Sequence, residues 1–157
     1  MDKTALRAAL LHQLESDLAL QTAAALTSRD EATSEESKAE NKYDMRAQEA
    51  AYLAEGQARL VADLRESMAV YTSLPLPAFA PEDAIAVGAV VSLAGDARAP
   101  AYFLGPRAGG TEFSVGDRRL LVVTPASPLG RQLLGRRRGD TVTLPGAKRP
   151  LAIASVA

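Results

Sequence analysis

Six carboxylates lie between Arg29 and Asp44, and they are the residues best suited to chemistry. They are Asp30, Glu31, Glu35, Glu36, Glu40 and Asp44. Carboxylates are hard oxygen ligands, and proteins bind Mg²⁺ through one or two of them together with waters and phosphate oxygens. An ion held in this way can orient a water molecule for attack on a phosphodiester. The cluster is therefore a candidate magnesium site.

The same acids also fit a purely structural interpretation. Ser37-x-x-Glu40 and Thr33-x-x-Glu36 both have the spacing of a capping box, in which side chains satisfy the free N–H groups at a helix start. Acids in a first helical turn are also favoured by the helix dipole. Both interpretations stay open at this point.

A second informative segment spans residues 127–142. Ser127 before Pro128 is typical of an N-cap followed by proline at the first helical position. The short helix that follows is expected to have one apolar face and to end at a left-handed glycine. The residues concerned are Leu129, Leu133, Leu134 and Gly135.

Basic residues follow the predicted short helix. Arg136, Arg137 and Arg138 form a run that Arg131 of the helix could join. Such a run either docks on an acidic partner surface or is an ordinary solvated face, and the sequence does not choose between them.

Two parts of the chain resemble Gre-type bacterial transcription elongation factors (the GreA/GreB family). The stretch 127–142 reads Ser-Pro-Leu-Gly-Arg near its start and Gly-Asp-Thr-Val at its end, as in the C-terminal signature of that family. Glu40-Asn41 matches the Glu-Asn pair at the family's helical tip, and Glu55-Gly56 matches a later pair with no gap between them. The family's tip aspartate, by contrast, falls on Ser37.

The resemblance implies an α+β protein, with an N-terminal antiparallel α-helical coiled-coil hairpin followed by a small FKBP-like β-rich domain. It implies docking on RNA polymerase through the signature, with the hairpin in the secondary channel and only indirect contact with nascent RNA. The docking residues would be Ser127, Pro128, Arg131, Arg136, Arg137 and Arg138. Glu40, with Glu36 in place of the family aspartate, would help hold a magnesium ion shared with the polymerase and stimulate transcript cleavage. Because Ser37 departs from the family, a channel-occupying regulator without cleavage activity is the alternative.

Composition divides the chain in two. Residues 73–157 contain all nine prolines and ten of the eleven glycines, so the first part is expected to be helical and the second β-rich. Residues 1–72 carry 8 basic against 13 acidic residues, whereas residues 73–157 carry 10 against 6. Neither part is basic enough to favour duplex DNA, and a protein partner with patches of both signs fits better.

The hydrophobic pattern predicts the elements. One amphipathic helix is expected from Thr4 to about Ser28, and a second from about Ser37 to Thr72, with a seam that ends at Tyr71. Strands are expected at 89–93, 101–104, 120–123, 141–144 and 151–155. We therefore predict a coiled coil over 1–73, a proline-rich linker over 74–82 and an FKBP-like domain over 83–157.

Several function classes are excluded or weakened. The chain has no cysteine, so thiolate metal sites are not available. Its one histidine, His12, falls in the predicted coiled coil, which argues against a Ser-His-Asp triad. A prolyl isomerase would need an aromatic pocket, for which the second part offers only Phe79, Tyr102, Phe103 and Phe113. A coiled-coil adaptor that dimerises through residues 1–72 is a further alternative. With no signal-peptide pattern and no membrane span, we expect a cytoplasmic monomer with no cofactor of its own.

Overall fold

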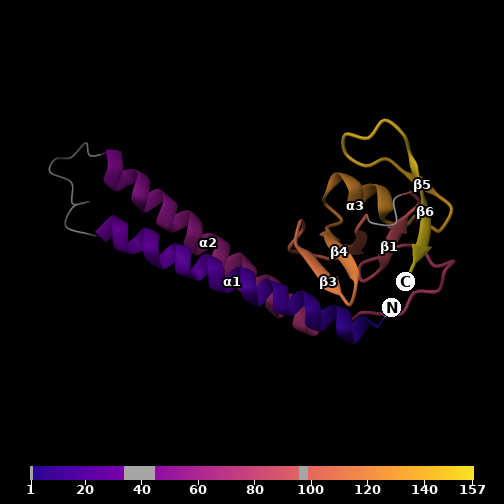
Figure 1. Ribbon diagram of the computed structural model, residues 1–157, viewed down its shortest axis with the longest axis horizontal. Coiled ribbons are helices and arrows are strands. Elements are labelled where there is room, and N and C mark those ends of the chain that lie inside the picture. The colour runs from indigo at the N-terminus through magenta and orange to yellow at the C-terminus, as the bar shows by residue number, and fades with distance from the viewer. Residues whose placement is uncertain (1, 34–44, 96–98) are drawn as a thin grey trace. The chain divides into compact units, whose positions relative to one another are not determined.

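The computed structural model describes residues 2–33, 45–95 and 99–157. Two long helices come first and a β-rich part follows, so the chain has the mixed α+β character that its sequence predicts (Figure 1). Coiled-coil packing of the helices and an FKBP-like topology stay predictions. The elements are α1 (Lys3–Thr33), α2 (Met45–Ser73), β1 (Val90–Leu93), β2 (Ala101–Leu104), β3 (Glu112–Val115), β4 (Arg118–Val123), α3 (Pro128–Leu133), β5 (Thr141–Val142) and β6 (Leu151–Val156).

The chain forms two compact units. The helical unit is Leu14–Ala69, and the sheet unit combines Met1–Gln13 with Val70–Ala157. The sheet unit therefore contains the first turns of α1 and the last turn of α2. No described helix is both long enough and apolar enough to span a membrane.

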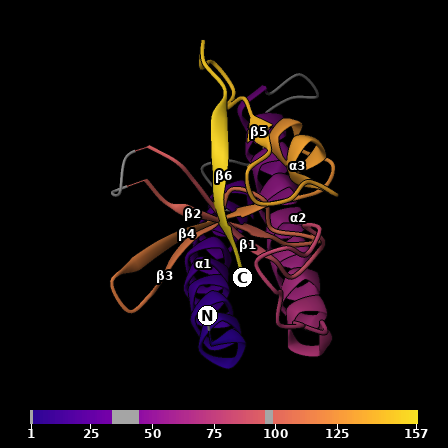
Figure 2. The ribbon, with the colours of Figure 1, turned by 90° about the vertical axis from the view of Figure 1, so that its right-hand side faces the viewer.

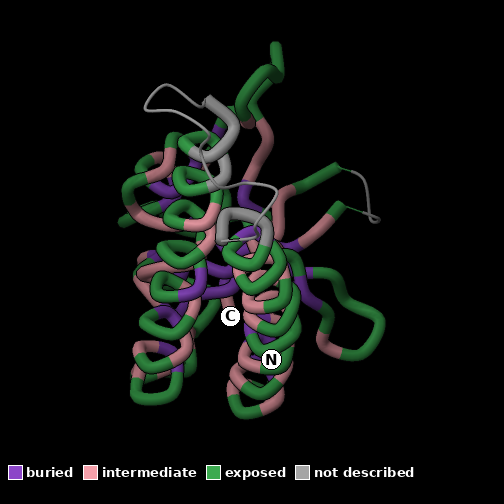
Figure 3. The backbone as a smooth tube through the Cα atoms, turned by 90° about the vertical axis from the view of Figure 1, so that its left-hand side faces the viewer, coloured by how far each residue is buried: buried purple, intermediate pink, exposed green. Residues whose placement is uncertain are grey.

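In the helical unit, α1 and α2 run in opposite directions (Figure 1). The seam predicted on α2 is the less exposed side of that helix, since Val61 is buried and Leu64 and Met68 are partly buried. Exposed residues cover much of the remaining surface of both helices (Figure 3).

Helix α1 extends beyond its predicted end. The sequence predicts a stop near Ser28, because Thr27 and Ser28 are typical capping residues, but the helix continues to Thr33. The Thr27 hydroxyl donates a hydrogen bond to the Ala23 carbonyl oxygen one turn earlier (3.1 Å), and Ser28 is buried. A hydroxyl that bonds back to its own helix in this way does not terminate it.

The sheet unit contains a six-stranded sheet in the order β3-β4-β2-β1-β6-β5, whose strands are labelled in Figure 2. Only β2 and β4 are parallel, and the other neighbours are antiparallel. Because successive side chains of a strand point to opposite faces, the sheet has two apolar faces. On one face, Tyr102 packs with Leu129 and Leu133 of α3, and on the other Phe103 lies beside Tyr71 of α2, with ring centroids 6.1 Å apart.

Strand β5 is shorter than predicted. It ends at Val142 rather than at Leu144, because the backbone of Thr143 pairs with the side chain of Gln132 on α3. The Thr143 N–H donates to Gln132 Oε1, and Gln132 Nε2 donates to the Thr143 carbonyl oxygen, both at 2.9 Å. The amide of Gln132 therefore occupies the place of a neighbouring strand.

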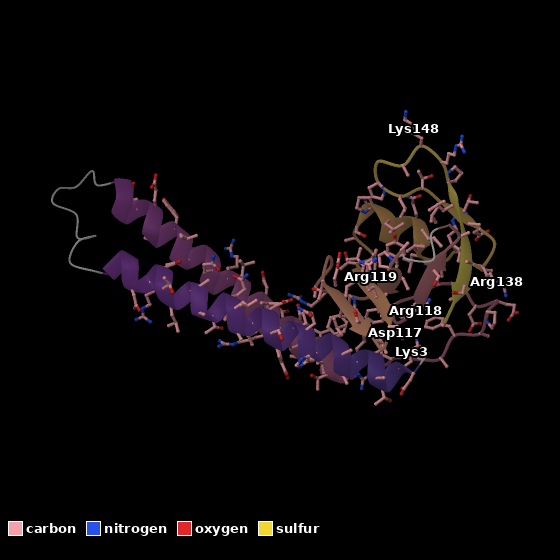
Figure 4. The ribbon with its side chains drawn as sticks, viewed as in Figure 1. Lys3, Asp117, Arg118, Arg119, Arg138 and Lys148 are labelled. Carbon is pink, nitrogen blue, oxygen red and sulfur yellow. The ribbon has the colours of Figure 1, made fainter. Side chains whose placement is uncertain are left out.

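Lys3 fastens the first turn of α1 to the rest of the sheet unit. Its Nζ donates to the backbone oxygens of Gly88 (2.6 Å) and Ala157 (2.8 Å) and lies 5.2 Å from the centroid of the Phe79 ring. Burial lowers the pKa of Lys3 to about 8. Figure 4 labels this side chain.

Tyr71 fastens the last turn of α2 in the same unit. Its ring is buried and its hydroxyl donates to the Arg107 carbonyl oxygen at 2.6 Å. Burial raises the pKa of Tyr71 to about 12, so the phenol stays protonated and remains a donor well into the alkaline range.

The raised pKa of Tyr71 predicts that the stability of the sheet unit depends on pH. The unfolded chain loses the phenol proton near pH 10, whereas the folded chain holds it until about pH 12, so the free energy of unfolding should fall as pH rises through that window. Urea unfolding at about pH 9 and about pH 11 measures the fall. Tyr71→Phe cannot titrate and should show a smaller fall, and equal falls in the two proteins would contradict the prediction.

Candidate functional site

The signature stretch folds around α3 as its sequence predicts. Ser127 is the N-cap, and its Oγ accepts a hydrogen bond from the Gly130 N–H at 3.0 Å. The same hydroxyl donates to the Thr124 carbonyl oxygen at 2.8 Å, so both of its functions are used within the chain. Pro128 occupies the first turn, where a missing N–H has no cost, and it is exposed.

The end of α3 agrees with the prediction in one respect and differs in another. Gly135 has a φ of +78°, the left-handed conformation expected of a glycine that stops a helix. Leu129 and Leu133 are buried, but Leu134 is 47% exposed. The prediction that Leu134 shares their apolar face is wrong, because α3 ends at Leu133 and Leu134 has already left the helical conformation (ψ 125°).

Gly130 is required by close backbone contact. A Cβ at this position would lie 1.9 Å from the Thr124 carbonyl oxygen and 2.7 Å from its carbon. That carbonyl also accepts the two hydrogen bonds from Ser127, one from its N–H and one from its hydroxyl, so it cannot move away without breaking the cap.

Gly130→Ala is therefore expected to destabilise the sheet unit by about 1–3 kcal/mol, the usual cost of overpacking. Urea unfolding measures the effect. Gly56→Ala is the control: nothing lies within 4 Å of a Cβ there, and alanine in a helix should stabilise by about 0.5–1 kcal/mol. A Gly130→Ala protein as stable as wild type would contradict the close contact.

The four predicted docking arginines differ in their surroundings. Arg131 donates from its guanidinium to the Ala126 carbonyl oxygen, and Arg137 donates to that of Glu82. Arg136 and Arg138 are exposed, and their side chains have no hydrogen-bond or ion-pair partner among the residues that the structure describes. Two of the four guanidiniums are thus held locally, and two are available to a partner.

The predicted docking residues do not form one cluster. Ser127 and Pro128 stand at the start of α3, whereas the arginine run follows Gly135 beyond its end. A six-residue helix separates the two groups by roughly 9 Å along its axis. A partner that touches both would have to lie along the length of α3.

A hollow of about 520 Å³ opens beside the start of α3. Ser127, Pro128 and Leu129 line it on one side, and Tyr102, Leu144 and Pro145 are among its other walls. Of these six residues, the sequence analysis assigns only Ser127 and Pro128 to docking. The connection after β5 brings Leu144 and Pro145 to the hollow. No local sequence pattern predicts that these residues lie beside the start of α3.

The candidate magnesium ligands Glu36 and Glu40 lie outside the described residues, as does Ser37. Within residues 2–33, 45–95 and 99–157, no group of three or more acidic, histidine or cysteine side chains is arranged to hold a metal ion. The magnesium site therefore stays a prediction.

The aromatic side chains that a prolyl isomerase would need do not converge. Tyr102 lies on the α3 face of the sheet, whereas Phe103 lies on the opposite face with Phe113, at 6.4 Å between ring centroids. Phe79 lies beside Lys3 and packs against the core cluster that contains Tyr102. This division gives the isomerase alternative no aromatic-lined pocket in the described part of the chain.

Comparison with known proteins gives similar solved structures, among them two Gfh1 proteins. The chain is 19% identical to the GreA factor homolog 1 (Gfh1) protein of Thermus thermophilus, with a TM-score of 0.38 and 94% of each chain covered. It is 20% identical to Gfh1 of Thermus aquaticus, with a TM-score of 0.32 and 92% of each chain covered. No protein-family model matches the sequence, and no curated protein matches it either.

Proposed function

We propose that this protein is a Gre-type transcription elongation factor that binds RNA polymerase. The observation that carries the proposal is the signature stretch, which resembles that family in sequence and folds as one capped helix ended by a left-handed glycine. Pro128, Arg136 and Arg138 are exposed around it. The docking surface proposed here consists of Ser127, Pro128, Arg131, Arg136, Arg137 and Arg138.

Charge supports a protein partner. The β-rich part is basic and the helical part is acidic, so a partner with patches of both signs is complementary to the chain. The guanidiniums of Arg136 and Arg138, which have no partner among the described residues, suit an acidic polymerase surface. We propose that the chain acts as a monomer in the cytoplasm, with the region around Glu40 placed in the secondary channel and only indirect contact with nascent RNA.

Cleavage of backtracked transcripts is the more specific form of the proposal. Glu40 and Glu36 would supply carboxylate oxygens to a magnesium ion shared with the polymerase active site, and such an ion activates water for phosphodiester hydrolysis when bound. The alternative form is a regulator that occupies the channel without cleavage, which the serine at position 37 favours. In both forms the chain itself is not an enzyme.

The experiment that tests the proposal has two stages. Retention of purified core RNA polymerase on the immobilised chain tests binding. Transcript cleavage on a backtracked elongation complex then separates the two forms. If no polymerase is retained at low salt, the proposed function is wrong.

Charge reversal at Arg136 and Arg138 is expected to weaken polymerase binding about tenfold at low salt. This pair spares the hydrogen bond that Arg137 makes to Glu82, so folding should be unchanged. The difference should shrink as salt is added, because exposed charges are screened.

Lys148→Glu/Arg149→Glu is the matched control for Arg136→Glu/Arg138→Glu. Both pairs are exposed and both substitutions change the net charge equally, but Lys148 lies well apart from Arg138 (Figure 4). Equal loss of binding in the two double variants would show a net-charge effect rather than docking through this surface.

A further inference from the structure

A cavity of about 890 Å³ in the sheet unit is not used by the proposed docking surface. It lies at the edge where β1 ends and β2 and β4 begin. These ends meet because β2 and β4 are parallel, with Ala101 beside Leu120, while β1 runs antiparallel to β2. Its volume is within the range of about 300–1,000 Å³ that small-molecule sites occupy.

Much of the cavity wall is apolar. Leu93, Pro100, Leu144 and Leu151 contribute to it from four different segments of the chain. An apolar wall of this kind favours an organic body over a hydrated inorganic ion. It offers no hydrogen bonds to replace those that an ion loses when its hydration water is removed.

The guanidiniums of two arginines line the cavity. Arg118 and Arg119 are the first residues of β4, and Asp117 is the one acid among the lining residues that the structure describes (Figure 4). Consecutive strand residues point to opposite faces, so the two arginines approach from the two sides of β4. Arg118 donates to Ser92 Oγ at the end of β1, which holds its guanidinium beside the cavity.

Tyr102 adds a hydrogen-bond donor. Its side chain is largely buried and lines the cavity, and its hydroxyl has no hydrogen-bond partner among the residues that the structure describes. Burial raises the pKa of Tyr102, so the hydroxyl stays protonated and is able to donate a hydrogen bond to an anionic oxygen.

We propose that this cavity binds a small organic anion, a carboxylate or a phosphate ester carried on an apolar body. Guanidiniums match both head groups because their N–H donors pair with two oxygens at once. The apolar body would lie against Leu93, Leu144 and Leu151, with the head group at the start of β4, where Arg118 and Arg119 both reach the cavity from the two sides of the strand. Tyr102 lines the same cavity. This proposal does not rest on the proposed binding of RNA polymerase.

The test uses 8-anilinonaphthalene-1-sulfonate, an apolar anion whose fluorescence rises in such a site. Arg118→Gln/Arg119→Gln is expected to weaken dye binding about tenfold or more, the usual effect of losing hydrogen bonds to a charged group. Arg136→Gln/Arg138→Gln removes the same charge elsewhere and should leave dye binding unchanged. Equal affinities in the two double variants would overturn the proposal.

Displacement of the dye identifies the head group. Decanoate and decyl phosphate should both displace it, and their relative strengths distinguish a carboxylate from a phosphate ligand, whereas decanol should be much weaker. Decanol acting as well as decanoate would overturn the role of the arginines. Should the arginine variant lose its near-ultraviolet circular dichroism, Tyr102→Phe is the second variant: it retains the ring, and unchanged dye affinity there would also count against the proposal.

Discussion

Replacing Gly105 with alanine is expected to lower the free energy of unfolding of the sheet unit by about 2–4 kcal/mol. An alanine Cβ there would lie 2.1 Å from the hydroxyl oxygen of Tyr71 and 3.1 Å from both Tyr71 Cζ and Val122 Cγ1. The Tyr71 ring is buried against Phe103, so it has no free space to move into. Its hydroxyl would also have to leave the Arg107 carbonyl oxygen. Overpacking and a lost hydrogen bond therefore add together.

A second substitution identifies the cause. Tyr71→Phe removes the oxygen nearest to the new methyl group and alone should cost about 0.5–1.5 kcal/mol, the worth of one hydrogen bond. In the double variant Gly105→Ala/Tyr71→Phe the closest remaining contacts are the two at 3.1 Å, so it should be more stable than Gly105→Ala alone. Urea unfolding followed by near-ultraviolet circular dichroism, which reports on tyrosine packing, measures all four proteins. Strictly additive costs would contradict a direct clash between the two side chains.

Local patterns were sufficient to predict much of the sheet unit. The strands at 101–104 and 151–155 follow from short apolar runs separated by glycine and proline turns, although β6 runs on to Val156. The capped helix α3 follows from a serine before a proline. Strand β3 was not predicted, although a signal for it exists. Glu112–Val115 alternates polar and apolar residues, and Gly116-Asp117 forms a two-residue hairpin connection to β4 with Gly116 at φ +58°.

Contacts between distant segments could not be predicted in this way. Tyr71 was placed on a helical seam, but its hydrogen bond to Arg107 joins residues 36 positions apart. The end of β5 depends in the same way on Gln132, a side chain of another element. Periodicity reports which side of an element is apolar, and it carries no information about the partner that covers that side.

In the candidate site, too, contacts between segments could not be predicted from the sequence. The sequence identifies four arginines near α3, but only the structure separates Arg131 and Arg137, which bond to nearby carbonyl oxygens, from Arg136 and Arg138. The cavity at Arg118 and Arg119 had no sequence signal, because its walls come from five segments that the strand order brings together.

Glu40→Ala is expected to abolish stimulated transcript cleavage while leaving polymerase binding nearly unchanged. The proposed docking surface lies in the β-rich part, so the loss of one carboxylate removes a proposed magnesium ligand without touching that surface. The capping interpretation of Glu40 predicts a different result, a loss of about 0.5–2 kcal/mol of helix stability with no specific loss of activity. Cleavage on a backtracked complex, measured at saturating concentrations of each protein, distinguishes the two. Glu31→Ala is the matched control, since it removes a carboxylate from the same acidic stretch at a position outside the proposed pair.

Ser37→Asp tests the same assignment in the opposite direction. It introduces an acid at the position where the Gre-type family has its aspartate, and aspartate is as good an N-cap as serine, so helix stability should change little. Cleavage should therefore rise above that of the wild type if Glu40 is aligned correctly with the family glutamate. Binding to the polymerase should be unchanged, because the proposed docking surface does not include this residue. If the wild type and Ser37→Asp both fail to stimulate cleavage in a backtracked complex that they demonstrably bind, then the cleavage proposal is wrong and the chain acts by occupying the channel.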